Sequence, residues 1–142
     1  MAAPRPRRAG RRAGAGQALV EFALVFPVFV LLLAGMIDFG LGLYSYMSLI
    51  SAAREGARLG VTACTATDCA SAVQAKVTAS SNGLAPTVTV ACANTAGTAE
   101  ACTSSASGHS VTVTASYTYH MIWPLTFGTQ IPMGSSVKMM LE

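Results

Sequence analysis

The feature that most constrains this chain is a run of 20 residues, 18–37, in which Glu21 is the single charged residue. A helix of that length, at about 1.5 Å per residue, covers roughly 30 Å, the thickness of a bilayer's hydrocarbon core. A helix inside a soluble protein of 142 residues is rarely apolar on all sides for so long. The run therefore predicts one membrane-spanning helix.

The charges on either side of the run predict its orientation. Residues 1–16 hold five of the nine basic residues and no acid, whereas Asp38 follows the run and the next basic residue is Arg54. Positive flanks stay in the cytoplasm, so we expect a single-pass protein of the cytoplasmic (inner) membrane with its C-terminal part outside. The formal charge of +3 belongs to the basic leader, and we therefore expect no nucleic-acid partner.

Helical periodicity continues beyond the apolar run. Pro27 removes the hydrogen bond to the carbonyl of Ala23, which predicts a kink, and Gly60 is a plausible C-terminal cap. An apolar stripe at spacings of three or four predicts an amphipathic helix, formed by Phe39, Leu43, Met47, Ile50, Ala53 and Ala57. The expected organisation is a basic cytoplasmic leader over 1–16, a transmembrane and amphipathic helix over 17–60, and an exported domain over 61–142.

The exported part is expected to be a small antiparallel sheet with one short helix, which makes the whole chain α+β. Residues 70–80 form the predicted helix, which Asn82-Gly83 ends. Alternation of β-branched and polar residues predicts strands, and loops join them. The predicted strands are 87–92, 111–119 and 135–141, and the predicted loops are 93–109 and 120–134.

Four cysteines, Cys64, Cys69, Cys92 and Cys102, lie on the predicted exported side, where disulfides can form. Four cysteines permit three pairings, and the two short loops favour Cys64 with Cys69 and Cys92 with Cys102. The spacing differs from the C-x2-C typical of zinc ligands, so no metal site is expected.

No catalytic motif is visible, so we expect no enzyme, no cofactor and no small-molecule substrate. Residues 121–133 form an apolar loop that includes Trp123 and Phe127. Such a loop belongs either to the core of a small domain or its membrane-facing edge, or to a contact between subunits. The sequence leaves both interpretations open.

The junction of leader and apolar run carries the sharpest motif, Gly16-Gln17 followed by Glu21. It resembles the processing site of type IV prepilins, where a membrane aspartyl peptidase cuts after the glycine and the fifth residue of the mature chain is glutamate. A carboxylate within hydrocarbon costs about 2.5–3.5 kcal/mol or more near the middle of a helix. A cut after Gly16 would create an α-ammonium on Gln17 that Glu21 of a neighbouring helix could face. Alternatively, Glu21 lies at the cytoplasmic interface with its carboxylate in water.

A wider resemblance covers about a third of the chain. Residues 17–27 (QALVEFALVFP), 37–40 (IDFG) and 52–58 (AAREGAR) resemble the TadE-like family, pseudopilins of tight-adherence (Flp-type) pilus systems. The ending, residues 137–142, is also similar, although Lys138-Met139 departs from the family's closing pattern. The resemblance implies a pilin-like fold and a minor pilus component, either retained in the membrane or extracellular in the pilus. It also implies processing by prepilin peptidase and partners among pilin and pseudopilin subunits and pilus assembly platform proteins.

Several further residues are candidates for contacts within such an assembly. Asp38 either marks the outer water interface or pairs with a neighbouring subunit. The glycines of the helix either permit close helix approach or merely face lipid; they are Gly35, Gly40 and Gly42, with Gly56 beyond them. Arg54, Glu55 and Arg58 form either a solvated face or a contact with the outer domain or a partner, and Glu55 and Arg58 are spaced to pair weakly.

Two other functions compete with this one. The chain could be an uncleaved single-pass anchor for an extracellular binding domain, which would have no need of a free amine beside Glu21. It could also be a secreted product of signal peptidase I, although the apolar run exceeds the roughly 7–15 residues usual for a signal peptide.

Overall fold

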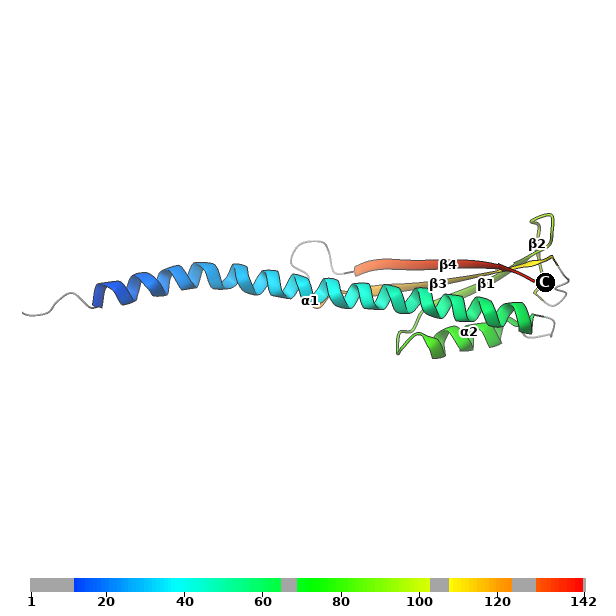
Figure 1. Cartoon of the computed structure of the whole chain (residues 1–142), viewed down its shortest axis with the longest axis horizontal. Coiled ribbons are helices and arrows are strands. Elements are labelled where there is room, and N and C mark those ends of the chain that lie inside the picture. The colour runs from blue at the N-terminus through cyan, green and yellow to red at the C-terminus, as the bar shows by residue number, and fades with distance from the viewer. Residues whose placement is uncertain (1–11, 65–68, 103–107, 124–129, 142) are drawn as a thin grey trace, which may run out of the picture. The chain divides into compact units, whose positions relative to one another are not determined.

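The computed structural model describes residues 12–64, 69–102, 108–123 and 130–141, with side chains from Gly16 onward (Figure 1). The chain divides into two compact units, Met1–Ile37 and Asp38–Glu142. The fold is α+β, as the sequence predicts, with a long N-terminal helix followed by a small antiparallel sheet. Its elements in chain order are α1 (Arg12–Ala63), α2 (Cys69–Ser80), β1 (Thr87–Ala93), β2 (Ala99–Glu100), β3 (Ser110–His120) and β4 (Gln130–Met140).

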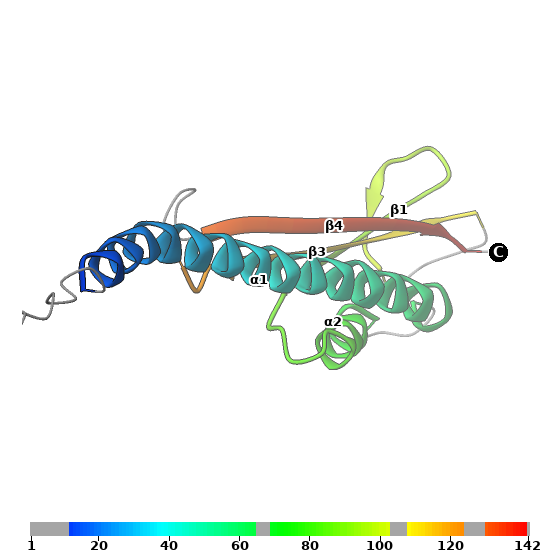
Figure 2. The ribbon, with the colours of Figure 1, turned by 60° about the vertical axis from the view of Figure 1, so that its left-hand side comes forward.

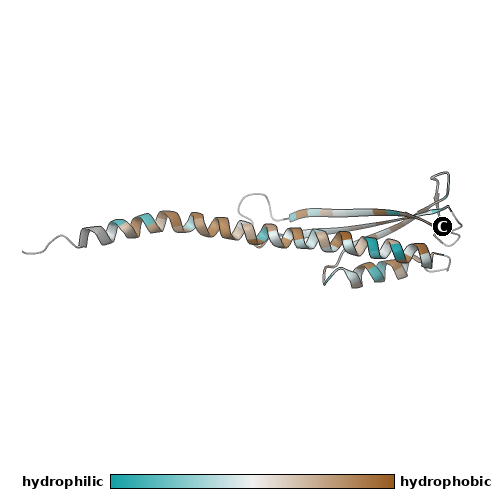
Figure 3. Cartoon of the chain, in the orientation of Figure 1, coloured by the Kyte–Doolittle hydropathy of each residue, from teal (hydrophilic) through white to brown (hydrophobic). Residues whose placement is uncertain are grey.

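The first unit, as far as it is described, is the N-terminal part of α1. Pro27 lies inside the helix, and the kink expected there stays a prediction. Large apolar side chains are exposed around this segment, including Leu24 and Met36, which are 71% and 72% exposed. Figure 3 shows the hydrophobic colour running along it. Among the described residues one helix, Gly16–Ala63, is long and apolar enough to cross a membrane, by its length and composition.

In the second unit, four antiparallel strands form one sheet in the order β2-β1-β3-β4. Val90, Val113 and Val137 stand in register across the three long strands. The side chains of β3 alternate between the core and solvent, with Val111 and Val113 fully buried. The sheet therefore packs on one face, which is the usual arrangement for an antiparallel sheet.

The C-terminal part of α1 packs on this sheet through small residues. The most buried positions of the helix are Ala52, Ala53, Gly56 and Ala57, with Leu49 as the one large side chain. Small residues here let the helix backbone come close to β3 and α2. Figure 2 shows α1 running beside β3 and β4, with α2 next to it.

This packing corrects the predicted stripe. Ala53 and Ala57 are buried as expected, but Phe39, Leu43 and Met47 point outward and are 74%, 51% and 59% exposed. The stripe therefore does not form one buried face, because its large members are exposed and its alanines are in the core.

The expected end of the helix is also corrected. Gly60 is not a cap, because α1 continues to Ala63 and the Cys64 N–H donates to the Gly60 carbonyl at 3.0 Å. A Cβ at Gly60 would lie 3.0 Å from Cγ1 of Val111. The glycine therefore serves close packing against β3 rather than helix termination.

The short helix α2 confirms the prediction for residues 70–80 to within one residue. Val73 and Val77 are its fully buried side chains. The turn that follows has positive φ at Asn82 (52°) and Gly83 (84°), a conformation that these two residue types tolerate best. The Ser48 hydroxyl donates to the Ser81 carbonyl at 3.1 Å, which ties the end of α2 to α1.

Two strand boundaries differ from the prediction. The short strand β2 lies within the predicted loop 93–109, and β4 begins at Gln130, within the predicted loop 120–134. Pro132 lies within β4. It is tolerated because β4 is an edge strand, where a missing N–H leaves no central ladder bond unmade.

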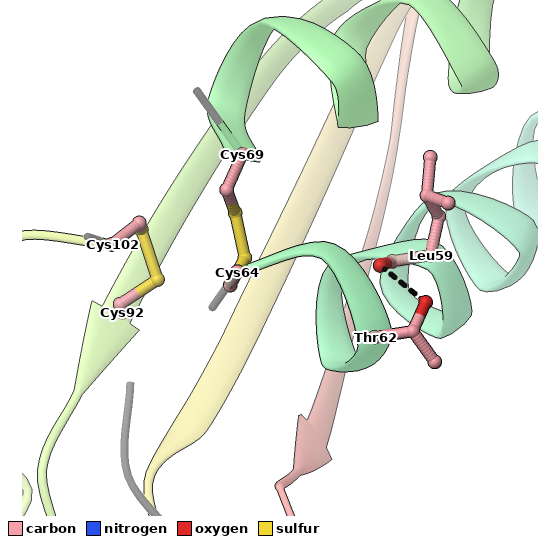
Figure 4. The surroundings of a disulfide bond; sticks show 6 residues. All are labelled: Leu59, Thr62, Cys64, Cys69, Cys92 and Cys102. Atoms are coloured by element: carbon pink, nitrogen blue, oxygen red, sulfur yellow. Dashed lines mark hydrogen bonds between the residues drawn. A yellow bond between two sulfur atoms is a disulfide. The ribbon is translucent and has the colours of Figure 1, made fainter. Parts of the chain in front are cut away.

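Two disulfides join neighbouring elements (Figure 4). Cys64 and Cys69 connect the end of α1 to the start of α2, and Cys92 of β1 is bonded to Cys102 just after β2. The loops that they close are the two short ones favoured by the cysteine spacing.

Candidate functional site: the exposed helix face and the Asp38 turn

The motif predicted for processing lies on the exposed surface of α1 in the first unit. Gly16, Gln17 and Glu21 are all exposed, and nothing described lies within 4 Å of a Cβ built at Gly16. The Glu21 carboxylate forms no hydrogen bond or ion pair with any residue whose side chain is described. Its partner, if it has one, is outside this chain's described part.

The face of α1 that points away from the sheet is large and apolar. Leu41, Tyr44 and Tyr46, from the same stretch of the helix as Phe39, Leu43 and Met47, are 42%, 59% and 40% exposed. If residues 18–37 fill the hydrocarbon core, these residues follow it in the chain, and nine residues of helix add about 14 Å. The headgroup region of an ordinary bilayer, roughly 5–7 Å on each side, would cover Phe39 and Leu41 but not Leu43 to Met47.

Asp38 is the residue that organises the turn after β3. Its side chain is 8% exposed, and its two carboxylate oxygens accept the backbone N–H groups of Ile122 at 3.1 Å and Trp123 at 3.0 Å. Charge-assisted bonds of this kind are stronger than neutral ones. The carboxylate is therefore largely buried and satisfied within its own chain, and whether Asp38 marks the outer water interface or pairs with a neighbouring subunit stays a prediction.

The hydroxyl of Tyr119 closes the same cluster, 3.5 Å from the backbone carbonyl of Asp38. Burial, followed by the nearby Asp38 carboxylate, raises the pKa of Tyr119 above its ordinary value of 10.0. The phenol therefore stays neutral at physiological pH and can serve as a hydrogen-bond donor. Sequence reasoning missed this cluster because its members are separated by more than 80 positions, and only the alternation of β3 pointed to a buried Tyr119.

The glycines fall into two groups. Nothing described lies within 4 Å of a Cβ at Gly35 or Gly40, whereas a Cβ at Gly42 would lie 3.7 Å from both Tyr119 and Met133. Gly42 thus packs within the domain. A role for Gly35 and Gly40 in close helix approach would have to involve another chain, and it stays a proposal.

The charged group near the end of α1 faces solvent. Arg54, Glu55 and Arg58 are exposed, and none of them forms an ion pair with another described residue, so the weak Glu55–Arg58 pair is not seen. The ion pair present among the described residues joins His109 Nδ1 to Glu100 Oε2 at 3.4 Å, beside the Cys92–Cys102 loop.

A shallow cavity of about 310 Å³ lies at one end of the sheet. The described residues that line it carry no carboxylate or imidazole; they are Ala85, Thr87, Ser116, Tyr117, Thr118, Pro132 and Met133. In the described part of the chain no three histidine, cysteine or acidic side chains gather in a way that would hold a metal ion. The cavity therefore offers hydroxyl groups and no acid–base pair. Phe127, the other large aromatic of the loop 121–133, lies outside the described residues.

An exposed apolar helix near the N-terminus, followed by a small disulfide-bearing α+β domain, fits a membrane-anchored protein. Residues 16–58 match the family model described as TadE-like protein. The resemblance predicted from the sequence is thus confirmed over this segment, which covers the apolar helix and the outward face. No curated protein and no solved structure matches the chain.

Proposed function

We propose that this chain is a minor pilin-like subunit, a pseudopilin, that takes part in assembly of a tight-adherence type IV pilus. The TadE-like segment and the apolar helix fit a membrane protein associated with such a pilus. The finer role is supported by one observation above all, the large apolar face of α1 around Phe39, Leu43 and Met47.

That face argues for a protein partner because it has no use in an isolated anchor. Monomeric soluble surfaces rarely expose contiguous apolar patches of this kind, and those that do usually mark interaction sites. By residue count Leu43 and Met47 lie about 9 and 15 Å beyond the span, so lipid would not cover this part of the face. Packing against helices of other pilin or pseudopilin subunits would cover it.

We place the basic leader in the cytoplasm and the domain 61–142 outside. The five leader arginines support this orientation. The two disulfides support it independently, because such bonds persist in oxidising compartments and are rare in the cytosol.

Prepilin peptidase cuts this chain after Gly16 in our proposal. The cut leaves an α-ammonium on Gln17, with a reference pKa near 7.7–8.0. Glu21, exposed and unpaired among described side chains, then pairs with the amine of an adjacent subunit and sets the stagger between helices. Gly35 and Gly40 allow close approach of a neighbouring helix, and the exposed Arg54, Glu55 and Arg58 are available to assembly platform proteins.

The proposal is tested by deleting the gene in a host that makes the pilus and restoring it on a plasmid. We expect pili to disappear on deletion and to return with the wild-type chain. Leu43→Gln places a polar amide on the outward face and should leave the protein in the membrane but fail to restore pili. Ser51→Gln introduces the same side chain at an exposed, already polar position of α1 and should restore them.

The contrary result is also clear. Normal pili in the deletion strain would remove the assembly role and leave an anchored extracellular binding domain as the better function. Full rescue by Leu43→Gln would show that the apolar face is not the contact that assembly needs.

A further inference from the structure

Two large apolar side chains stand exposed on the turn that follows β3. Ile122 is 61% exposed and Trp123 is 52% exposed, so neither is part of the domain core. Both belong to the described residues, which end at Trp123 and resume at Gln130. Exposed tryptophan and isoleucine side by side are unfavourable in water and point to a contact with something else.

The turn is held in place rather than loose. The backbone N–H groups of Ile122 and Trp123 each donate to one oxygen of the Asp38 carboxylate, at 3.1 and 3.0 Å. Asp38 is itself largely buried, with Tyr119 beside it. Because both N–H groups are bonded to one largely buried carboxylate, the backbone of the turn is held where its two side chains are exposed.

The position of Asp38 in the chain indicates what lies nearby. It follows Ile37, the last residue of the apolar run, so the hydrogen bonds hold the turn at the level where that run ends. If the run spans a membrane, a lipid surface lies beside this level in every copy of the chain, whereas a neighbouring subunit is present only after assembly. Tryptophan is enriched at such interfaces, where its ring is in contact with lipid and its N–H with water.

We propose that Ile122 and Trp123 form a second membrane contact, in which the indole of Trp123 enters the lipid interface at the outer end of the span. Asp38 is the positioning residue. This inference rests on the proposed membrane orientation. The contact attaches the outer domain to the lipid surface at a second point and so restrains its orientation before assembly.

Tryptophan fluorescence reports on this contact directly, because Trp123 is the only tryptophan in the chain. The experiment uses the full chain reconstituted at low protein density into vesicles of phosphatidylethanolamine and phosphatidylglycerol. Flotation first establishes that the chain is inserted. Tryptophan emission is then recorded with lipids brominated near the headgroup end or near the chain end, and with iodide in the water.

The wild-type chain should emit at shorter wavelength than in denaturant, lose emission to bromine near the headgroup end, and resist iodide. Asp38→Ala should shift emission to longer wavelength and restore iodide quenching, because the turn is released. Glu55→Gln removes a carboxylate elsewhere on α1 and should change neither reading. Resistance of all four cysteines to alkylation checks that both disulfides are formed in each variant.

The possible failures are distinguishable. A chain that does not float with the vesicles contradicts the membrane function itself, and this inference with it. An inserted chain whose Trp123 is open to iodide overturns the inference alone. An inserted chain whose Trp123 resists both iodide and brominated lipid also overturns it, because the ring is then covered by protein.

Discussion

Three elements of the outer domain meet at Gly56. A Cβ built there would overlap Cγ2 of Val77 and lie 3.5 and 3.6 Å from Val73 and Val113. The α1 backbone thus lies directly against α2 and β3. A methyl group at this position cannot be accommodated by a flexible side-chain tip, because valine is branched at Cβ and stiff.

Gly56→Ala should therefore lower the free energy of unfolding by about 1–3 kcal/mol, the usual cost of overpacking. The loss comes despite alanine's advantage of roughly 1 kcal/mol in helix propensity. Denaturant unfolding of the full chain in detergent, followed by circular dichroism, measures it. Gly40→Ala is the matched control, since its Cβ meets nothing described within 4 Å, and it should be neutral or stabilising. Equal effects of the two variants would contradict the packing at Gly56.

The two sides of α1 differ most sharply at neighbouring positions. Leu49 is fully buried and Met47 is 59% exposed. Leu49→Ala should cost about 2–5 kcal/mol of the same unfolding free energy, through lost burial and a residual cavity. Met47→Ala should change the free energy of unfolding of the isolated chain by no more than about 0.5 kcal/mol. A large loss for Met47→Ala and none for Leu49→Ala would mean that the helix is turned the other way.

At the scale of elements, local sequence patterns predicted the helices, strands and turns that depend on residues close together in the sequence. The alternation in residues 111–119 identified β3, and the Asn82-Gly83 turn identified the end of α2. Gly60 was misread because glycine ends helices and also permits close packing, and sequence alone does not distinguish the two uses. The pairing of β2 with β1 and the start of β4 depend on partners that are distant in sequence.

The disulfide between Cys92 and Cys102 supports the hairpin of β1 and β2, because these two strands are paired at only two pairs of residues. Replacing both cysteines with serine should lower the free energy of unfolding by about 2–4 kcal/mol. The reason is that the denatured chain regains the conformational entropy that the disulfide-closed loop had lost. Denaturant unfolding of the double variant measures the loss. The hairpin's amide hydrogens should also exchange faster. Unchanged stability and exchange would show that the strand pairing holds the hairpin without the bond.

At the scale of the whole molecule, the two units have surfaces that suit different environments. The first is an exposed apolar helix, and the second is a one-sided sheet covered by α1 and α2. The sequence predicted the long apolar helix and the small antiparallel sheet that follows it, and the TadE-like resemblance was confirmed over residues 16–58. The Asp38 turn could not be foreseen, because hydrogen bonds across 84 and 85 positions leave no local pattern.

The orientation of the molecule leads to a prediction about its cysteines in cells. Membranes prepared in the presence of an alkylating agent should yield a chain with no labelled cysteine until a reductant is added, because all four are in disulfides. Protease added outside spheroplasts should remove the domain 61–142 and spare the membrane-spanning part of the helix. Free thiols, or a domain protected until the cells are broken, would contradict the outside location.

The central claim, that the chain is processed and assembled as a pilin-like subunit, is tested most directly by its N-terminal residue. The protein is extracted from membranes of cells with their own peptidases, and its terminal peptide is identified by mass spectrometry. The account predicts a terminus at Gln17, and a chain that keeps residues 1–16 when Gly16 is replaced by leucine. A wild-type terminus at Met1 or Ala2 would contradict it, because an uncut chain has no amine beside Glu21.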